Sequence, residues 1–140
     1  MSLHTGEVAG FEALLRWHHP KKGLVGPGRF IDVAEDAGLL TPMLEQLLPG
    51  ILEQAADWQQ RFRRHTPLFV NVNLSRTQCA DQALVERIAS LLDESEVAPY
   101  SIGFEMTESV MADDEAVLPM LRQLKTRNVR LLLDDFSTDY

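Results

Sequence analysis

The sequence predicts an α/β fold in which parallel strands alternate with helices packed outside them. Segments with strand character and segments with helix character follow one another four times along the 140 residues. The length and the 45% hydrophobic content suit one domain with a sizeable core. The chain carries no internal repeat and no low-complexity tract. Strands joined through helices in this way form right-handed parallel crossovers.

Four short apolar segments are the predicted strands. The first covers residues 8–17 and ends before a proline. The second covers residues 67–75 and alternates apolar with polar side chains towards its end. The third, YSIGFEMTES, covers residues 100–109, and the fourth, NVRLLLDD, covers residues 128–135. The segment KKGLVGPG, residues 21–28, is predicted to be a loop.

Local signals place the helices between these strands. The predicted helices span residues 30–37, 41–63, 75–93 and 113–127. Gly38 is placed to end the first helix as a C-terminal cap. Thr41 is the predicted N-cap of the second helix, which we expect to be kinked at Pro49. Ser75 and Gln78 form a capping box that opens the third helix.

Composition limits the class of partner and compartment. The net charge of −8 argues against a nucleic-acid partner, and an anionic substrate would need a metal ion or local arginines. No apolar run approaches the length of a membrane span, and no signal peptide is evident. The single Cys79 excludes an internal disulfide and fits a reducing cytoplasm. Residues 1–5 are interpreted as an N-terminal tail or expression remnant, and residues 6–140 as the folded domain.

Polar side chains follow the predicted strands at one edge of the sheet. Glu12 lies within the first strand, Asn73 ends the second, Glu105 is near the end of the third, and Asp134 and Asp135 end the fourth. The carboxyl ends of parallel strands form the functional rim of such folds. Carboxylate and amide oxygens are hard ligands, which suit Mg²⁺ or Mn²⁺. Adjacent aspartates can face two ions about 4 Å apart, as in phosphoryl chemistry.

Each of these residues also has a structural interpretation. Glu12 alone could face solvent or form a salt bridge, and Asn73 could simply start the turn that follows it. Asp134 and Asp135 could cap a following turn. Three histidines also suggest a metal site, but loop and surface positions explain them better: His18, His19 and His65.

Four motifs in order give the chain a family resemblance. They are FEALLRW, VNVNLS, FEMTES and LLLDDF, and the segment GPGRFIDVAEDAGLL adds to them. Together they resemble the EAL domain family, the phosphodiesterases of cyclic di-GMP, over residues 6–140. The resemblance implies part of a TIM-like (β/α)8 barrel with about four parallel strands and flanking helices. It also implies hydrolysis of cyclic di-GMP to linear pGpG with Mg²⁺ or Mn²⁺.

The resemblance assigns a role to each residue of the rim. Glu12, Asn73 and Glu105 match metal ligands of the family, and Glu12 is also counted among the catalytic residues. Asp134 and Asp135 match the aspartate pair that holds the metal ions and the attacking water.

Three further positions match residues outside the metal ligands. Leu14 and Arg16 match positions that contact the nucleotide, the arginine through a phosphate. Glu108 matches a glutamate that steadies the loop after the aspartate pair.

Two departures from the family pattern set the remaining expectations. Ser137 and Asp139 stand where the family typically has glycines. A complete barrel needs about 250 residues, and the rest of the family's barrel supplies a lysine, a further glutamate and a glutamine. We therefore expect no hydrolysis by these 140 residues and self-association through open sheet edges. The alternative function is a non-catalytic domain that binds cyclic di-GMP or a protein partner.

Overall fold

A computed structural model describes residues 6–63, 65–107, 110 and 114–134. The strands are β1 (Gly10–Ala13), β2 (Trp17–His19), β3 (Gly23–Val25), β4 (Phe69–Asn73), β5 (Ile102–Thr107) and β6 (Arg130–Asp134). The helices are the 3-10 turn η1 (Pro27–Arg29), α1 (Ile31–Asp36), α2 (Leu40–Arg61), α3 (Arg76–Cys79), α4 (Gln82–Glu94) and α6 (Asp114–Lys125). The predicted tail over residues 1–5 lies outside the described residues.

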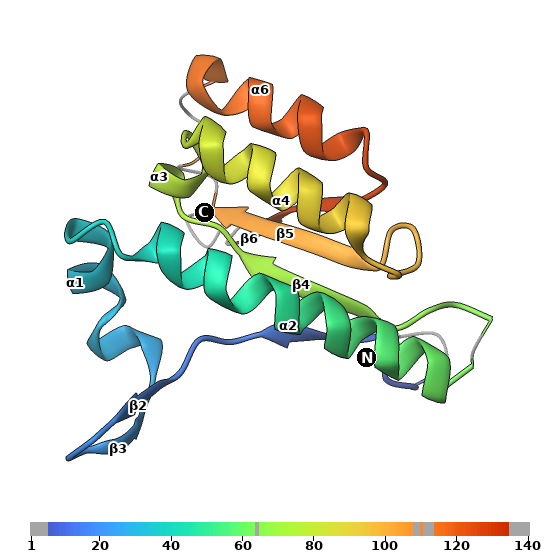
Figure 1. The fold of residues 1–140 in the computed structure, drawn as a ribbon, viewed down its shortest axis with the longest axis horizontal. Helices are drawn as coiled ribbons and strands as arrows, with labels where there is room; N and C mark the ends of the chain where they lie inside the picture. The colour runs from blue at the N-terminus through green and yellow to red at the C-terminus, as the bar shows by residue number, and fades with distance from the viewer. Residues whose placement is uncertain (1–5, 64, 108–109, 111–113, 135–140) are drawn as a thin grey trace, which may run out of the picture.

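The fold is built on a four-stranded parallel sheet with the strand order β1-β4-β5-β6. Figure 1 shows α2, α4 and α6 side by side on one face of this sheet. Each parallel pair is joined through at least one helix, as the alternation of elements predicts. The expected α/β class, with four parallel strands and flanking helices, is confirmed.

The hydrophobic core lies between the sheet and the helices. Alternate residues of the central strands point into it, and Ile102, Phe104 and Met106 of β5 are at most 2% exposed. Val70 and Val72 do the same from β4. Helix positions three, four or seven residues apart cover them, among them Leu44, Leu48 and Leu52 of α2, Leu84, Ile88 and Leu92 of α4, and Val117, Met120 and Leu124 of α6. Each fully buried side chain of this size stabilises the fold by about 1.5–3 kcal/mol.

The first predicted strand is shorter than the sequence indicates. β1 ends at Ala13, and the chain then leaves the sheet for an antiparallel hairpin of β2 and β3. The segment predicted to be a loop, residues 21–28, contains β3 and the first two residues of η1. Figure 1 shows the hairpin projecting away from the sheet. The ring of Trp17 lies 4.6 Å from that of His19 and 5.8 Å from that of Phe30, measured between centroids. The hairpin therefore has a small apolar contact of its own. The sequence does not reveal it, because the predicted first strand continues from residue 8 to Trp17.

The turn between α1 and α2 confirms one cap and corrects another. Gly38 has a φ of +67°, and the amides of Gly38 and Leu39 bond to the carbonyls of Glu35 and Ala34, a Schellman motif. This tight turn starts α2 already at Leu40, so Thr41 is not its N-cap. Helix α2 then runs through Pro49 to Arg61.

The predicted helix over residues 75–93 is two helices. The capping box of Ser75 and Gln78 is present, but it opens only the four-residue α3. Asp81 then adopts an extended conformation, and its side chain accepts from the amides of Ala83 and Leu84 at 3.1 and 3.2 Å. The second N-cap six residues after the first divides the segment, because an extended residue cannot continue a helix.

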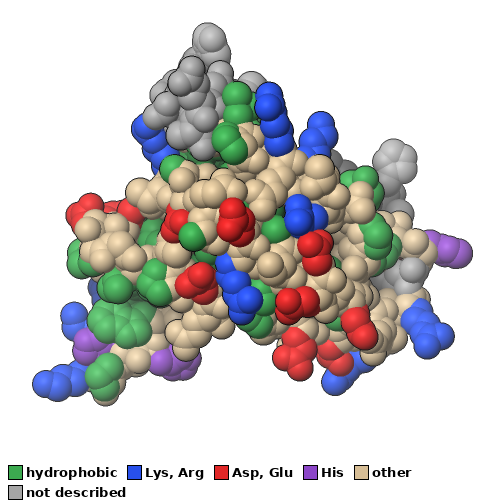
Figure 2. All heavy atoms as spheres, turned by 45° about the horizontal axis from the view of Figure 1, so that its top comes forward, with side chains coloured by type: hydrophobic (Ala, Val, Ile, Leu, Met, Phe, Trp, Pro, Cys, Tyr) green, Lys and Arg blue, Asp and Glu red, His purple; other side chains and the backbone are tan. Residues whose placement is uncertain are grey.

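Charge is unevenly spread over the surface. Figure 2 shows acidic side chains distributed across one face, with lysines and arginines more often towards its edges. On the helical side, Glu53, Asp57, Glu94 and Glu96 line a shallow groove of about 410 Å³ between α2 and α4. This groove is therefore unfavourable for an anionic ligand. In the described part of the chain, no helix is both long and apolar enough to cross a membrane.

Candidate active site at the carboxyl ends of the strands

The face of the sheet opposite the helices is polar. Glu12 pairs in register with Asn71, and Asn73 pairs with Glu105. Because side chains alternate across a strand, all four point to this one face, away from the apolar core. Three successive strands in space, β1, β4 and β5, thus bring their polar side chains together.

Two hydrogen bonds link these side chains across the strands. Asn73 Nδ2 donates to Glu12 Oε1 at 2.7 Å, and Asn71 Nδ2 donates to Glu105 Oε1 at 2.5 Å. Glu12 and Asn73 are exposed, Glu105 is half-buried, and Asn71 is buried. The carboxylates are therefore held by amides, and the two amides separate the glutamates that would otherwise repel each other.

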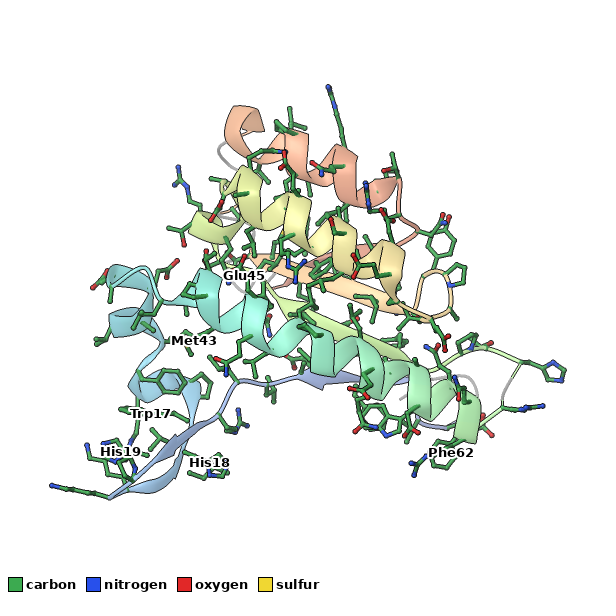
Figure 3. The ribbon with its side chains drawn as sticks, in the orientation of Figure 1. Trp17, His18, His19, Met43, Glu45 and Phe62 are labelled. Carbon is green, nitrogen blue, oxygen red and sulfur yellow. The ribbon has the colours of Figure 1, made fainter. Side chains whose placement is uncertain are left out.

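A cavity of about 600 Å³ opens beside this cluster. Asn73 and Glu105 line it from the sheet, and Leu14 and Arg16 line it from the segment after β1. Its apolar wall comes mainly from α1 and α2: Ile31, Leu40, Met43, Leu44, Leu47 and Ile51. Figure 3 shows Met43 on the first part of α2, near the hairpin. A volume of this size with a few convergent polar groups fits a small-molecule ligand.

Arg16 supplies positive charge at this end of the sheet. Its side chain is exposed, and Nη1 donates to the carbonyl of Leu15 at 2.8 Å, which leaves further guanidinium donors for a ligand. Arg130 lies on the same face but towards the amino ends of the strands, with its guanidinium carbon 4.1 Å from the ring centroid of Phe69. An anion entering the cavity therefore meets Arg16 rather than Arg130.

The remaining predicted site residues are only partly covered by the structure. Asp134 is the last residue of β6, and its backbone pairs with Thr107. The side chain of Asp134, and all of Asp135 and Glu108, lie outside the described residues, as do the substituted positions 137 and 139.

The donor set fits a hard divalent cation. The side chains at the rim offer oxygen, whereas His18 and His19 lie out on the hairpin (Figure 3). His19 Nδ1 accepts from the backbone amides of Lys21 and Lys22, which explains its position without a ligand. Within the described residues, no group of three or more His, Cys, Asp or Glu side chains forms a metal cluster. A half-turn of the Asn73 amide would place Oδ1 against Glu12, and two such oxygens are stable together only with a cation between them.

One residue of this face is missing from the sequence-based site. Asn71 is only 8% exposed, and its Oδ1 is buried without a hydrogen-bond partner among the described residues. Leaving such an atom unpaired costs about 1–3 kcal/mol. The signal was present in the motif VNVN, because two asparagines two residues apart on a strand share a face.

Four parallel strands with helices on one face and a polar site at the strand carboxyl ends are the architecture of part of a (β/α)8-type barrel domain. The EAL domain model matches residues 1–140, so the chain belongs to the EAL domain family. This confirms the resemblance of the four motifs. Phosphodiesterases of this family generally depend on divalent metal ions.

Two relatives illustrate the similarity in sequence. The bifunctional diguanylate cyclase/cyclic di-GMP phosphodiesterase MucR of Pseudomonas aeruginosa is 38% identical over 137 residues, which are 97% of this chain and 20% of MucR. The cyclic di-GMP phosphodiesterase PdeR of Escherichia coli is 35% identical over 136 residues, 96% of this chain and 20% of PdeR. The chain thus spans about a fifth of the length of these relatives.

Solved structures show the same fold. The PaMucR phosphodiesterase in complex with c-di-GMP superimposes with a TM-score of 0.83 at 37% identity, covering 94% of this chain and 53% of that chain. The EAL enzyme Bd1971 in its cAMP- and cyclic-di-GMP-bound form gives a TM-score of 0.80 at 27% identity, covering 92% of this chain and 36% of that chain. Both cover nearly the whole chain, which supports the TIM-like architecture.

Proposed function

We propose that this chain carries the metal-binding rim of a phosphodiesterase that hydrolyses cyclic di-GMP to linear pGpG. The observation that carries the proposal is the meeting of Glu12, Asn73 and Glu105 from three strands beside the 600 Å³ cavity. The family membership and the c-di-GMP complex of PaMucR point to the same ligand.

The residues divide into a metal-binding set and a nucleotide-binding set. Glu12, Asn73 and Glu105 would hold Mg²⁺ or Mn²⁺ through oxygen, and Asp134 and Asp135 complete the set. A cation bound there would neutralise the phosphodiester and lower the pKa of a bound water. Holding donor groups in fixed positions before the reaction is the largest contribution that such a site makes.

The cavity beside the metal-binding set would bind the substrate. Arg16 would bind a phosphate oxygen, and Leu14 would contact the nucleotide, because both side chains line the cavity. Glu108 would steady the loop that carries Asp135. The groove between α2 and α4 is acidic and disfavours the dianionic substrate, whereas the cavity beside the rim offers Arg16. The buried thiol of Cys79 fits a cytoplasmic location.

A second candidate function is binding of cyclic di-GMP without hydrolysis. Ser137 and Asp139 favour it, because they replace glycines of the family pattern. Glycine adopts positive φ at little cost, whereas serine and aspartate do not. Asp139 also adds negative charge to a loop that the resemblance assigns to the phosphate site. Such a domain would keep the cavity and the Glu12–Asn73 pair but would act as a receptor.

The test measures binding and hydrolysis separately. Isothermal titration with cyclic di-GMP, with and without Mn²⁺, reports binding, and chromatography of linear pGpG reports hydrolysis. We expect Mn²⁺-dependent binding that is lost in Glu12→Gln and kept in His65→Ala, an exposed residue of the α2–β4 connection. Hydrolysis would assign an enzyme. Binding without hydrolysis is the result we expect of these 140 residues alone, and an assay of a longer chain that contains a complete barrel then separates an enzyme from a receptor. Absence of any metal-dependent binding to the wild-type chain would overturn both.

A further inference from the structure

Asn71 lies deeper in the sheet than the residues that form the rim. Asn71 pairs in register with Glu12 on β1 and with Gly103 on β5. It precedes Asn73 by two residues on β4, so both asparagines lie on the same face of the sheet. Three polar residues are buried in the described part of the chain, namely Asn71, Gln78 and Ser101. Gln78 bonds to backbone groups of Leu40 and Ser75, and Ser101 bonds to a backbone carbonyl, so both have a structural explanation.

Asn71 instead bonds to a side chain of the candidate site. Its Nδ2 donates to Glu105 Oε1, crossing from β4 to β5. Glu105 thus has Asn73 beside it in register and Asn71 beneath it. With Oε1 occupied by an N–H donor, the second oxygen, Oε2, is the one left to bind a cation.

The neighbouring strand leaves room for this arrangement. A Cβ atom at position 103 would overlap Asn71 Oδ1 and would lie 2.7 Å from Leu132 Cδ1. The absence of a side chain at Gly103 therefore lets the Asn71 amide approach β5 closely. The Oδ1 atom faces this space unpaired, so the amide is held in place through its bond to Glu105 rather than by a full set of partners.

We propose that Asn71 is a positioning residue of the metal site: it fixes the carboxylate of Glu105 so that the other oxygen faces the cation. The inference rests on the proposed function, and it assigns a role to a residue outside the metal-ligand set. Residues that orient metal ligands by hydrogen bonds typically change metal affinity by about ten- to a hundredfold when they are removed.

The first test is Mn²⁺ affinity, measured by electron paramagnetic resonance in the 140-residue chain. Asn71→Leu keeps the approximate volume and removes the donor, and Asn71→Ser shortens the side chain out of reach of Glu105. We expect each to weaken Mn²⁺ binding by about tenfold or more. Ile88→Val, which removes a buried methyl group from α4, is the control for lost stability and should leave the affinity unchanged.

A second measurement follows the amide itself. The ¹⁵N side-chain resonance of Asn71, identified by its loss in Asn71→Ser, should shift in Glu105→Ala and when Mg²⁺ is added. The shift in Glu105→Ala tests the hydrogen bond itself, and the shift on adding Mg²⁺ tests the positioning role. A purely structural asparagine would show no shift with Mg²⁺, and its variants would behave like Ile88→Val.

The outcomes separate the two proposals. Failure of the wild-type chain to bind Mn²⁺ would remove the proposed function, and this inference with it. Wild-type Mn²⁺ binding that Asn71→Leu and Asn71→Ser leave unchanged would overturn the positioning role alone. Gly103→Ala, which pushes on Asn71 Oδ1 without replacing either partner, should weaken Mn²⁺ binding in the same direction.

Discussion

Asn73 donates its side-chain amide to the carboxylate of Glu12, which lies 61 residues earlier in the chain, across a distance of 2.7 Å. The bond joins the edge strand β1 to β4 at the carboxyl end of the sheet. Both side chains are exposed, so water competes for the bond and its net stabilisation is small. The bond matters because it holds two side chains with oxygen atoms, from distant segments of the chain, close enough to bind the same cation.

Glu12→Ala should therefore separate function from stability. We expect Mn²⁺ binding to be lost, while the free energy of unfolding changes by less than about 1 kcal/mol because the removed bond is exposed. Calorimetric titration and urea denaturation on the same preparation measure the two effects. A large loss of stability with Mn²⁺ binding retained would assign Glu12 to the fold instead.

Asp81 should contribute more to stability than its surface position indicates. Its side chain caps α4 through two backbone amides and also accepts from Thr41 Oγ1 at 3.4 Å, which links α4 to α2. Asp81→Ala should lower the free energy of unfolding by about 1 kcal/mol. Arg87→Ala, on the exposed side of the same helix, should stay within about 0.5 kcal/mol. Equal effects of the two variants in urea denaturation would contradict the cap.

Cys79 should make stability depend on alkaline pH. Burial raises the pKa of its thiol from 9.0 to about 12 in the folded chain. Between these values the unfolded chain loses the proton and the folded chain keeps it. The contribution of the protonated thiol to the free energy of unfolding is therefore complete below pH 9. It is lost as pH rises towards 12, by up to about 1.4 kcal/mol per pH unit.

Comparison with Cys79→Ala isolates this effect from the lysines and tyrosines that titrate in the same range. The wild-type chain should lose more stability between pH 8 and pH 10 than the variant does. The folded thiol should also resist iodoacetamide at pH 8, because it is 1% exposed and protonated. Parallel pH profiles, or rapid alkylation of the folded chain, would contradict the burial of this group.

The sheet edges predict association between copies. In the described sheet β1 and β6 each pair on one side only, and Phe11 and Leu133 on these strands are 43% and 45% exposed. Unpaired edges with apolar side chains favour pairing with another chain. We expect sedimentation velocity to show a concentration-dependent dimer that Leu133→Lys weakens. A monomer at every concentration would exclude edge pairing.

The sequence by itself determined the alternation of elements and the chemistry of the rim. Local periodicity shows which strand positions face the helices, and capping residues such as Ser75 and Gly38 act within a few residues of themselves. The order of the four motifs was enough to identify the family. The metal-ligand role of Glu12, Asn73 and Glu105 stays a prediction from that resemblance.

Only the tertiary structure decided which side chains meet. Strand register joins residues far apart in the chain, and no local pattern shows that Asn71 bonds to Glu105 or that Gly103 makes room for it. The end of β1 at Ala13 has the same origin, because Trp17 finds its ring partners in the hairpin and in Phe30 rather than in the sheet. Where the local apolar pattern favours a longer strand and the packing of distant segments favours another conformation, the packing decides.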